Sequence, residues 1–184
     1  MSPRFHGLLA LMLLHHARRP ARYAGSGRLV PLAEQNRSLW NTALIAEGVD
    51  VLQAALAREA LGEYQAQAAI AALHADAQHH DETDWLQIVE WYDEILELAP
   101  SDIVRMNRAV ALGEADGPHV GLAALATVAD PTPRRAAVSA YLLERAGDTA
   151  RALAEYERAA AQATSVAERD HLLQQAARLR SRPE

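Results

Sequence analysis

Residues 136–163, AAVSAYLLERAGDTARALAEYERAAAQA, are the stretch from which the fold class can be inferred. Small or apolar side chains recur at helical spacing on both sides of a central Gly147-Asp148 pair. Gly147 can adopt the left-handed conformation that ends a helix, and Asp148 can cap the helix that follows. The stretch therefore predicts two helices joined by a tight turn, a helical hairpin.

The hairpin also fits one unit of a tetratricopeptide (TPR) repeat, whose period is about 34 residues. Ala140, Ala152 and Ala159 fall at the small positions of such a unit, and Tyr156 at the aromatic one. One hairpin cannot bury its apolar face alone, so further units should lie beside it. Turn signals recur about every 14–17 residues, half a TPR period, near residues 100, 117, 131, 147 and 164. We predict an all-α, TPR-like array of antiparallel helical hairpins, with a generic hairpin as the alternative.

Composition supports a helical chain in a reducing compartment. The chain has 184 residues, half of them hydrophobic, with few aromatic side chains, so alanine and leucine must supply most of the packing. It has no cysteine, which excludes disulfides, thiolate catalysis and cysteine metal sites. The apolar run 5–14 is too short to span a bilayer. His15, His16, Arg18 and Arg19 follow that run instead of a signal cleavage site. We expect a soluble, cytoplasmic protein with no membrane partner.

Charge is segregated along the chain. The net charge is −6, yet residues 1–40 hold six arginines against Glu34 alone, while residues 41–102 hold thirteen acids against Arg58 alone. An acidic middle is a poor surface for nucleic acid. It suits a basic partner or the chain's own basic start. We therefore expect no specific DNA binding by this chain.

Helical patterns and turn residues divide the rest of the chain. We expect a loop at 20–32 to separate two parts: an N-terminal helix and loop over 1–32, packed on the array, and a TPR-like helical domain over 33–184. Thr132 is expected to cap the hairpin, with Pro133 at its first helical position. Ser165 and Glu168 form a capping-box pattern. The remaining predicted helices are a buried one at 7–17 and others at 34–62, 64–77, 83–98, 103–115, 118–130 and 166–180.

Five stretches of the chain together form a specific pattern: GLLALMLLHHARRPAR (7–22), LAEQNRSLWNTALIAEG (32–48), YQAQAAIAALHADA (64–77), TDWLQIVEWYDEIL (83–96) and NRAVALGEADGPHVGL (107–122). In their order and spacing they resemble the C-terminal TPR-like extension of a group of bacterial extracytoplasmic-function (ECF) sigma factors. The residues that match its motifs are Gln35, Asn36, Arg37, Trp40, Asp84 and Trp85. The family usually has aspartate where this chain has Asn36, and often where it has Asn41. Any role that requires carboxylates at those two positions is therefore in doubt.

The resemblance implies regulation of transcription initiation through protein contact. Full-length members of the group resemble two promoter-reading helical domains followed by this extension. No helix-turn-helix with a basic recognition helix is visible here, so we expect either an excised domain or a freestanding relative. The implied partner is the sigma factor's promoter-reading domains or RNA polymerase. Two alternatives stay open: a freestanding TPR-like scaffold with an unrelated partner, and an enzyme that uses an acidic helical face.

Candidate catalytic and metal-binding residues match no established motif. Carboxylates at 90, 93, 94 and 97 share one helical face, where like charges repel, so the face is hydrated or meets a basic partner. No nucleophile elbow, P-loop or Rossmann fingerprint is present. We predict no catalytic residue, no cofactor and no metal. The most ligand-rich segment has no compact metal spacing and is expected to be a solvated loop; it holds His74, His79 and His80 with Asp76, Asp81, Glu82 and Asp84.

A protein-binding groove is predicted on the first helix of a repeat, which lines the inner face of TPR arrays. Arg105, Asn107 and Arg108 interrupt an otherwise apolar helix there and can hold a peptide carboxylate or backbone. Trp91 and Tyr141 complete the predicted groove. The alternative is that the two arginines only pair with nearby acids such as Asp102.

Overall fold

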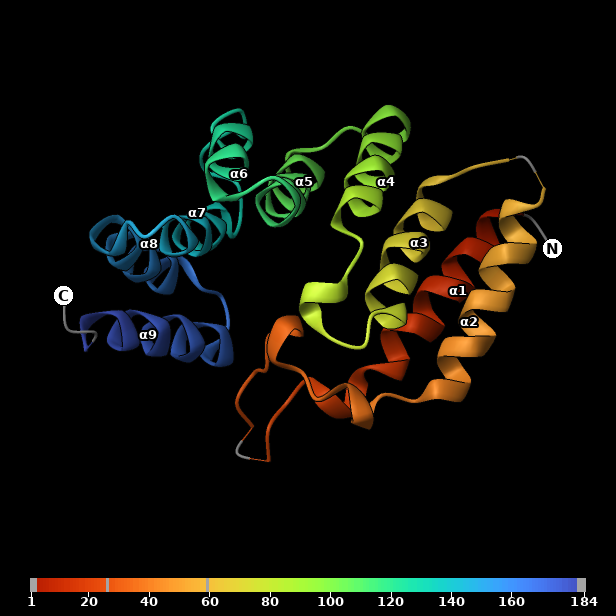
Figure 1. The fold of residues 1–184 in the computed structure, drawn as a ribbon, viewed down its shortest axis with the longest axis horizontal. Helices are drawn as coiled ribbons and strands as arrows, with labels where there is room; N and C mark the ends of the chain where they lie inside the picture. Colours follow the sequence, from red (N-terminus) through yellow and green to blue (C-terminus); the bar gives the residue numbers. More distant parts are fainter. Residues whose placement is uncertain (1–2, 26, 59, 182–184) are drawn as a thin grey trace. The chain divides into compact units, whose positions relative to one another are not determined.

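The chain is built from helices throughout the part that the structure describes. A computed structural model describes the backbone of residues 3–25, 27–58 and 60–181. These residues form nine α-helices and four short 3-10 helices, and their only strand-like contact is an isolated bridge between Tyr23 and Leu29. The predicted all-α class is confirmed, and the helical hairpins are consistent with a repeat-like array (Figure 1). The chain divides into two compact units, residues 1–100 and 101–184.

In the first unit, α1 lies between two other helices. Helix α1 packs against α2 and α3, and α4 packs against α3 (Figure 1). Ala10 and Leu14 of α1 are fully buried, and they form one core with Leu52 of α2 and Ala68 of α3. The predicted domain boundary after residue 32 lies inside this unit. Its helices are α1 (Pro3–Ala17), α2 (Thr42–Leu56), α3 (Glu63–Asp76) and α4 (Trp85–Leu98).

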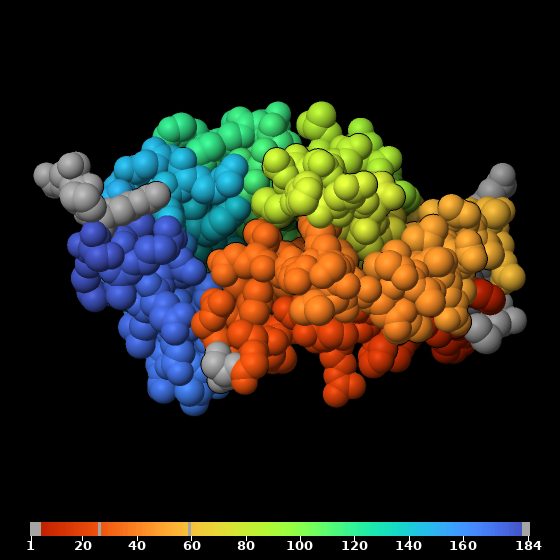
Figure 2. All heavy atoms as spheres, turned by 60° about the horizontal axis from the view of Figure 1, so that its bottom comes forward, coloured from red at the N-terminus to blue at the C-terminus, as the bar shows by residue number. Residues whose placement is uncertain are grey.

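The segment that joins α1 to α2 corrects the sequence prediction. A continuous helix was expected from residue 34, but α2 begins only at Thr42. Three short 3-10 helices precede it: η1 (Arg19–Ala21), η2 (Leu32–Glu34) and η3 (Arg37–Leu39). Figure 2 shows the described parts of this segment in orange on the visible face, with part of α1 (red) exposed below them.

Two asparagines explain the interruption. The Asn36 side chain accepts a hydrogen bond from the Ser38 N–H at 3.1 Å and caps η3. The Asn41 side chain accepts from the Leu44 N–H at 3.1 Å and caps α2. Such side chains compete with helical backbone bonds and favour helix starts. As a result Leu39, expected on the core stripe, is 51% exposed.

The second unit contains the predicted hairpin, which is confirmed. Gly147 has a φ of 81°, and the Asp148 carboxylate accepts from the Arg151 N–H at 3.1 Å. Ala152 and Tyr156 are buried in one core, as the spacing predicted. The unit's helices are α5 (Asp102–Ala115), α6 (Pro118–Leu125), α7 (Arg135–Arg145), α8 (Thr149–Gln162) and α9 (Val166–Arg180). Consecutive helices pack against one another along this unit.

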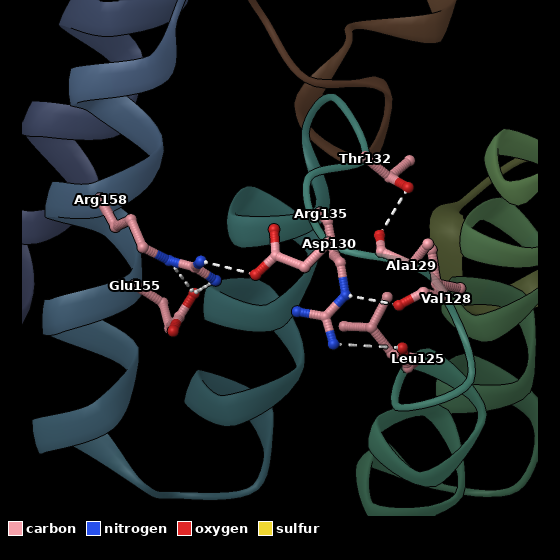
Figure 3. Close-up of polar contacts among 8 residues, drawn as sticks. All are labelled: Leu125, Val128, Ala129, Asp130, Thr132, Arg135, Glu155 and Arg158. Atoms are coloured by element: carbon pink, nitrogen blue, oxygen red, sulfur yellow. Dashed lines mark hydrogen bonds and ion pairs between the residues drawn. The ribbon is translucent and has the colours of Figure 1, made fainter.

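The start of α7 differs from the prediction. Thr132 was expected to cap this helix, but its hydroxyl donates to the Ala129 carbonyl at 2.6 Å, and α7 begins at Arg135 (Figure 3). Arg134, with a φ of 66°, stands between them in the left-handed region, which a helix interior excludes. Arg135 Nε then donates to the Val128 carbonyl at 3.1 Å and ties the connecting segment to α7.

Arg158 of α8 holds the same connecting segment from the other side. Its Nη1 lies 3.3 Å from Asp130 Oδ2, and its Nη2 lies 2.7 Å from Glu155 Oε2 on the preceding turn (Figure 3). One guanidinium therefore bridges the segment between α6 and α7 to α8. The final helix begins at the predicted cap, because the Ser165 hydroxyl accepts from the Glu168 N–H at 3.2 Å. The predicted capping box is not completed, since the Glu168 carboxylate binds Arg134 instead.

Candidate functional site

Arg37 is the centre of a polar and aromatic cluster in the first unit. Its Nη1 donates to the Ala77 carbonyl at 2.7 Å and also to the His74 carbonyl. These carbonyls lie at the C-terminal end of α3, where helical partners are missing and a cation is favourable. The guanidinium also lies 4.7 Å from the ring centroid of Trp40. Arg37 thus ties η3 to the end of α3 and to the aromatic core beside it.

Trp40 contacts a second, buried arginine. Its side chain is 5% exposed, and the guanidinium carbon of Arg18 lies 5.9 Å from its ring centroid. Arg18 is 8% exposed and makes no ion pair with any carboxylate in the described parts of the chain. Burial, helped by the nearby charges of Arg22 and Arg37, lowers the pKa of Arg18 to about 10. The cluster therefore contains a positive charge, that of Arg18, which no carboxylate of the described residues neutralises through an ion pair.

Two histidines close the cluster against Trp85. The rings of His74 and His80 meet the Trp85 ring edge-on, at centroid distances of 5.3 and 5.2 Å. Burial lowers the pKa of His74 to about 4, and the charge of Arg18 adds to this effect, so the imidazole is neutral at pH 7. The sequence prediction of a solvated loop is wrong for these two residues. Because the Trp85 ring packs edge-on against His74 and His80, both histidines are half-buried.

Three of the six motif residues, Arg37, Trp40 and Trp85, lie in this cluster, and the other three make local contacts in the segments beside it. Gln35 Nε2 donates to the Val30 carbonyl at 3.1 Å and holds the segment that leads into η3. Asp84 caps α4, since its carboxylate accepts from the Gln87 N–H at 2.9 Å and so orients the adjacent Trp85. The cluster draws on four of the five resembling stretches, namely those of 7–22, 32–48, 64–77 and 83–96.

The departures from the family pattern leave the local structure intact. Asn36 and Asn41 both act as caps, and an amide oxygen accepts the same N–H hydrogen bond that an aspartate oxygen would accept. The capping role at the two positions does not require a carboxylate. Sequence reasoning could not establish this, because the motif alone does not say what each side chain contacts.

The predicted groove residues on α5 point to different faces. Arg105 forms an ion pair with Asp102 at 3.0 Å, as the alternative interpretation expects. Glu114 lies nine residues after Arg105, about two and a half helical turns, and is therefore on the opposite face of α5 from Arg105. Asn107 lies seven residues from Glu114, about two turns, and shares its face. Arg108 is half-buried.

Tyr141 belongs to a separate polar contact in the second unit. Its hydroxyl donates to Glu114, which also pairs with Arg145 at 3.3 Å. Burial and the Glu114 carboxylate raise the pKa of Tyr141. Trp91 lies in the first unit, half-buried against that unit's core. The structure therefore brings Tyr141 to the α5 face of Asn107 and Glu114, and leaves Arg105 on the other face.

A groove on the outer side of α1 was missed by sequence reasoning. It has a volume of about 440 Å³. Helix α1 was expected to be buried because it is apolar on all sides. In the structure α2 and α3 cover only part of it, so that Phe5 is 62% and Met12 61% exposed. The groove is lined by Leu9, Met12, Leu13, His15, His16, Arg19 and Arg22.

A second, smaller groove lies in the other unit, between the segment before α7 and helices α8 and α9. It has a volume of about 330 Å³, and Ala159 and Leu172 contribute to its apolar floor. An ion pair of 2.8 Å between Arg134 and Glu168 stands at its rim. This pair stabilises the left-handed turn before α7 and gives the groove a polar edge.

The described residues hold no group of three or more histidine, aspartate or glutamate side chains arranged for a metal ion. None of the helices described is long and apolar enough to cross a bilayer.

A family model matches the N-terminal segment, and a curated relative aligns along nearly the whole chain. Residues 1–56 match a family of unknown function (DUF6596). That segment contains Arg18, Arg37, Trp40 and the groove on α1. An uncharacterized protein of Rhizobium meliloti is 36% identical over 189 aligned positions, which cover 99% of this chain and 44% of that protein. The chain thus spans less than half the length of this curated relative. No solved structure matches the chain.

Proposed function

We propose that this chain is a TPR-like protein-interaction domain that regulates an ECF-type sigma factor, and hence transcription initiation, without reading promoter DNA itself. The observation that carries the proposal is the cluster around Trp40 and Trp85. Four stretches that resemble the sigma-factor extension, separated along the chain, contribute to this one cluster. This convergence supports the proposal, because scattered helical similarity does not require the resembling stretches to meet in one cluster.

The exposed surface supports an interaction role. Helix α1 presents large apolar side chains beside arginines, a composition typical of protein-binding surfaces. The relative from Rhizobium meliloti has more than half of its length outside the match, which leaves room for promoter-reading domains in such proteins. The partner in this proposal is a sigma factor's promoter-reading domains or RNA polymerase, in the cytoplasm.

The test is a titration of the full chain with two partners, measured by calorimetry. The first is the promoter-reading part of the ECF-type sigma factor encoded in the same or the adjacent reading frame, and the second is core RNA polymerase. We expect saturable binding to at least one and a changed yield of run-off transcript from the sigma factor's promoter. Binding to neither would contradict the proposal and favour a scaffold with an unrelated partner. A gel-shift assay of the chain alone on promoter DNA should show no salt-resistant complex.

A further inference from the structure

The outer face of α1 carries an uncovered apolar stripe. Phe5, Leu9 and Met12 follow one another at spacings of four and three residues, and they are 62%, 39% and 61% exposed. Such spacing places side chains on one side of a helix. The groove of about 440 Å³ runs beside this stripe and ends at the C-terminal turn of α1.

Positive charge gathers at the C-terminal end of the same groove. Arg19 and Arg22 line it, and neither forms an ion pair with a carboxylate in the described parts of the chain. The Arg22 guanidinium is fixed in place, because its Nη2 donates to the His15 carbonyl at 2.9 Å. In residues 1–40 the single acid, Glu34, already lies 3.8 Å from Arg28. Within the described residues no carboxylate pairs with these two arginines, so both charges are available to an acidic partner.

Length and polarity define the partner. The stripe from Phe5 to Arg19 covers fourteen residue steps, about 21 Å, which is the length of a helix of roughly four turns. A helix that lies antiparallel to α1 brings its own N-terminus to Arg19 and Arg22. Acidic residues are favourable in a first turn, where they also meet the two arginines. Apolar side chains on the following turns then fit against Leu9 and Met12.

We propose that the outer face of α1 is the docking surface for an acidic amphipathic helix of the sigma polypeptide, bound antiparallel to α1. This inference rests on the proposed function and adds the place and the chemistry of the contact. A membrane surface is less well matched to a groove, because a bilayer requires a protruding apolar face. Vesicle binding is therefore treated as an outcome of the test.

The test measures the affinity of the full chain and its variants for the sigma factor's promoter-reading part by calorimetry. Met12→Glu and Arg19→Glu change the two halves of the surface, and both residues are exposed. Leu173→Glu and Arg169→Glu are matched controls on α9, where Leu173 is 47% exposed. We expect each α1 variant to raise Kd about tenfold or more and each control to change it less than about twofold. Circular dichroism and melting temperature should be the same for all.

Each other outcome overturns the inference in a distinguishable way. If the sigma polypeptide binds all variants equally, the docking surface lies elsewhere and the proposed function stands. If the sigma polypeptide does not bind the unchanged chain but core RNA polymerase does, the docking inference is overturned and the proposed function stands. If neither binds, the proposed function fails, and a second probe tests α1. That probe is a blocked helical peptide of about four turns, with glutamate in its first turn and leucine at helical spacing; a scrambled peptide is its control. No preference between the two peptides overturns the docking surface. The docking surface is also overturned if the chain binds neither the sigma polypeptide nor the helical peptide, but binds vesicles of phosphatidylcholine and phosphatidylglycerol and loses that binding in Met12→Glu.

Discussion

Gly121→Ala is expected to destabilise the second unit, because α5 and α6 meet there without side chains between them. A Cβ at Gly121 would lie 2.7 Å from the Ala109 carbonyl oxygen and 2.8 Å from the Gly113 Cα. Both atoms belong to the backbone of α5, so the helices must separate by several tenths of an ångström. That separation loosens the core that Met106 and Leu142 share with α6.

The magnitude follows from two opposing terms. Alanine is favoured over glycine in a helix by about 1 kcal/mol. Overpacking costs about 1–3 kcal/mol, and its upper end applies because backbone must move. The net loss is about 2 kcal/mol, which lowers the melting temperature of a chain of this size by roughly 4–8 °C. Thermal melts followed by circular dichroism, with urea titrations at fixed temperature, measure it.

A graded series of glycines provides the controls. At Gly113 the nearest atom to an added Cβ is Leu142 Cδ2, the end of a fully buried side chain, and the nearest backbone atom is 3.7 Å away, so a side chain and no backbone has to move. Gly113→Ala should therefore cost less than Gly121→Ala. Gly25→Ala meets nothing within 4 Å and should leave the melting temperature unchanged. A Gly121→Ala chain that melts within about 1 °C of the unchanged chain would refute the close approach of α5 and α6.

Four further predictions test the cluster and the predicted groove. Arg37→Ala should lower the free energy of unfolding, measured by urea titration, by about 2–4 kcal/mol, because the contacts with the carbonyls of α3 and with Trp40 are lost. The control Arg169→Ala should change it by less than about 0.5 kcal/mol. Trp85→Ala, which removes a half-buried ring, should cost about 3 kcal/mol by the same measurement. The folded pKa of His74, about 4, lies below its unfolded value of 6.5, so the unfolded chain takes up the proton first. Stability should fall as pH drops from 6.5 toward 4, by at most about 1.4 kcal/mol per pH unit, and His74→Gln should reduce that slope. Arg108→Ala should weaken binding to sigma domains about ten- to a hundredfold with little change in melting temperature; unchanged affinity would remove Arg108 from the groove.

Local sequence determined the helices and their hairpin turns. Gly147 and Asp148 end one helix and start the next through contacts within a few residues, so their pattern was enough to predict the hairpin. The same holds for Ser165 at the start of α9 and for α3, whose predicted bounds differ from the observed Glu63–Asp76 by one residue at each end. Capping and turn interactions depend on neighbours along the chain, which the sequence displays directly.

The sequence identified several residues of the candidate site but did not predict that they lie together. The motif residues Arg37, Trp40 and Trp85 could be singled out, but nothing in their spacing showed that they meet beside His74. The interruption before α2 was missed because Leu39 fits a helical stripe, while the competing caps of Asn36 and Asn41 were not weighed. In that segment the helical spacing of Leu39 favours a helix, whereas the caps of Asn36 and Asn41 favour an interruption. The hydrogen bonds from Arg37 to two carbonyls at the end of α3 stabilise the interrupted conformation.

The surface of α1 was decided by tertiary structure alone. Its sequence is apolar on every side, and such a helix is buried only as far as its neighbours cover it. Helices α2 and α3 cover two sides, and Phe5, Leu9 and Met12 stay exposed. The sequence therefore predicted an apolar helix at 7–17, which in the structure begins at Pro3. Which of its faces stays exposed depends on packing between segments that are distant along the chain.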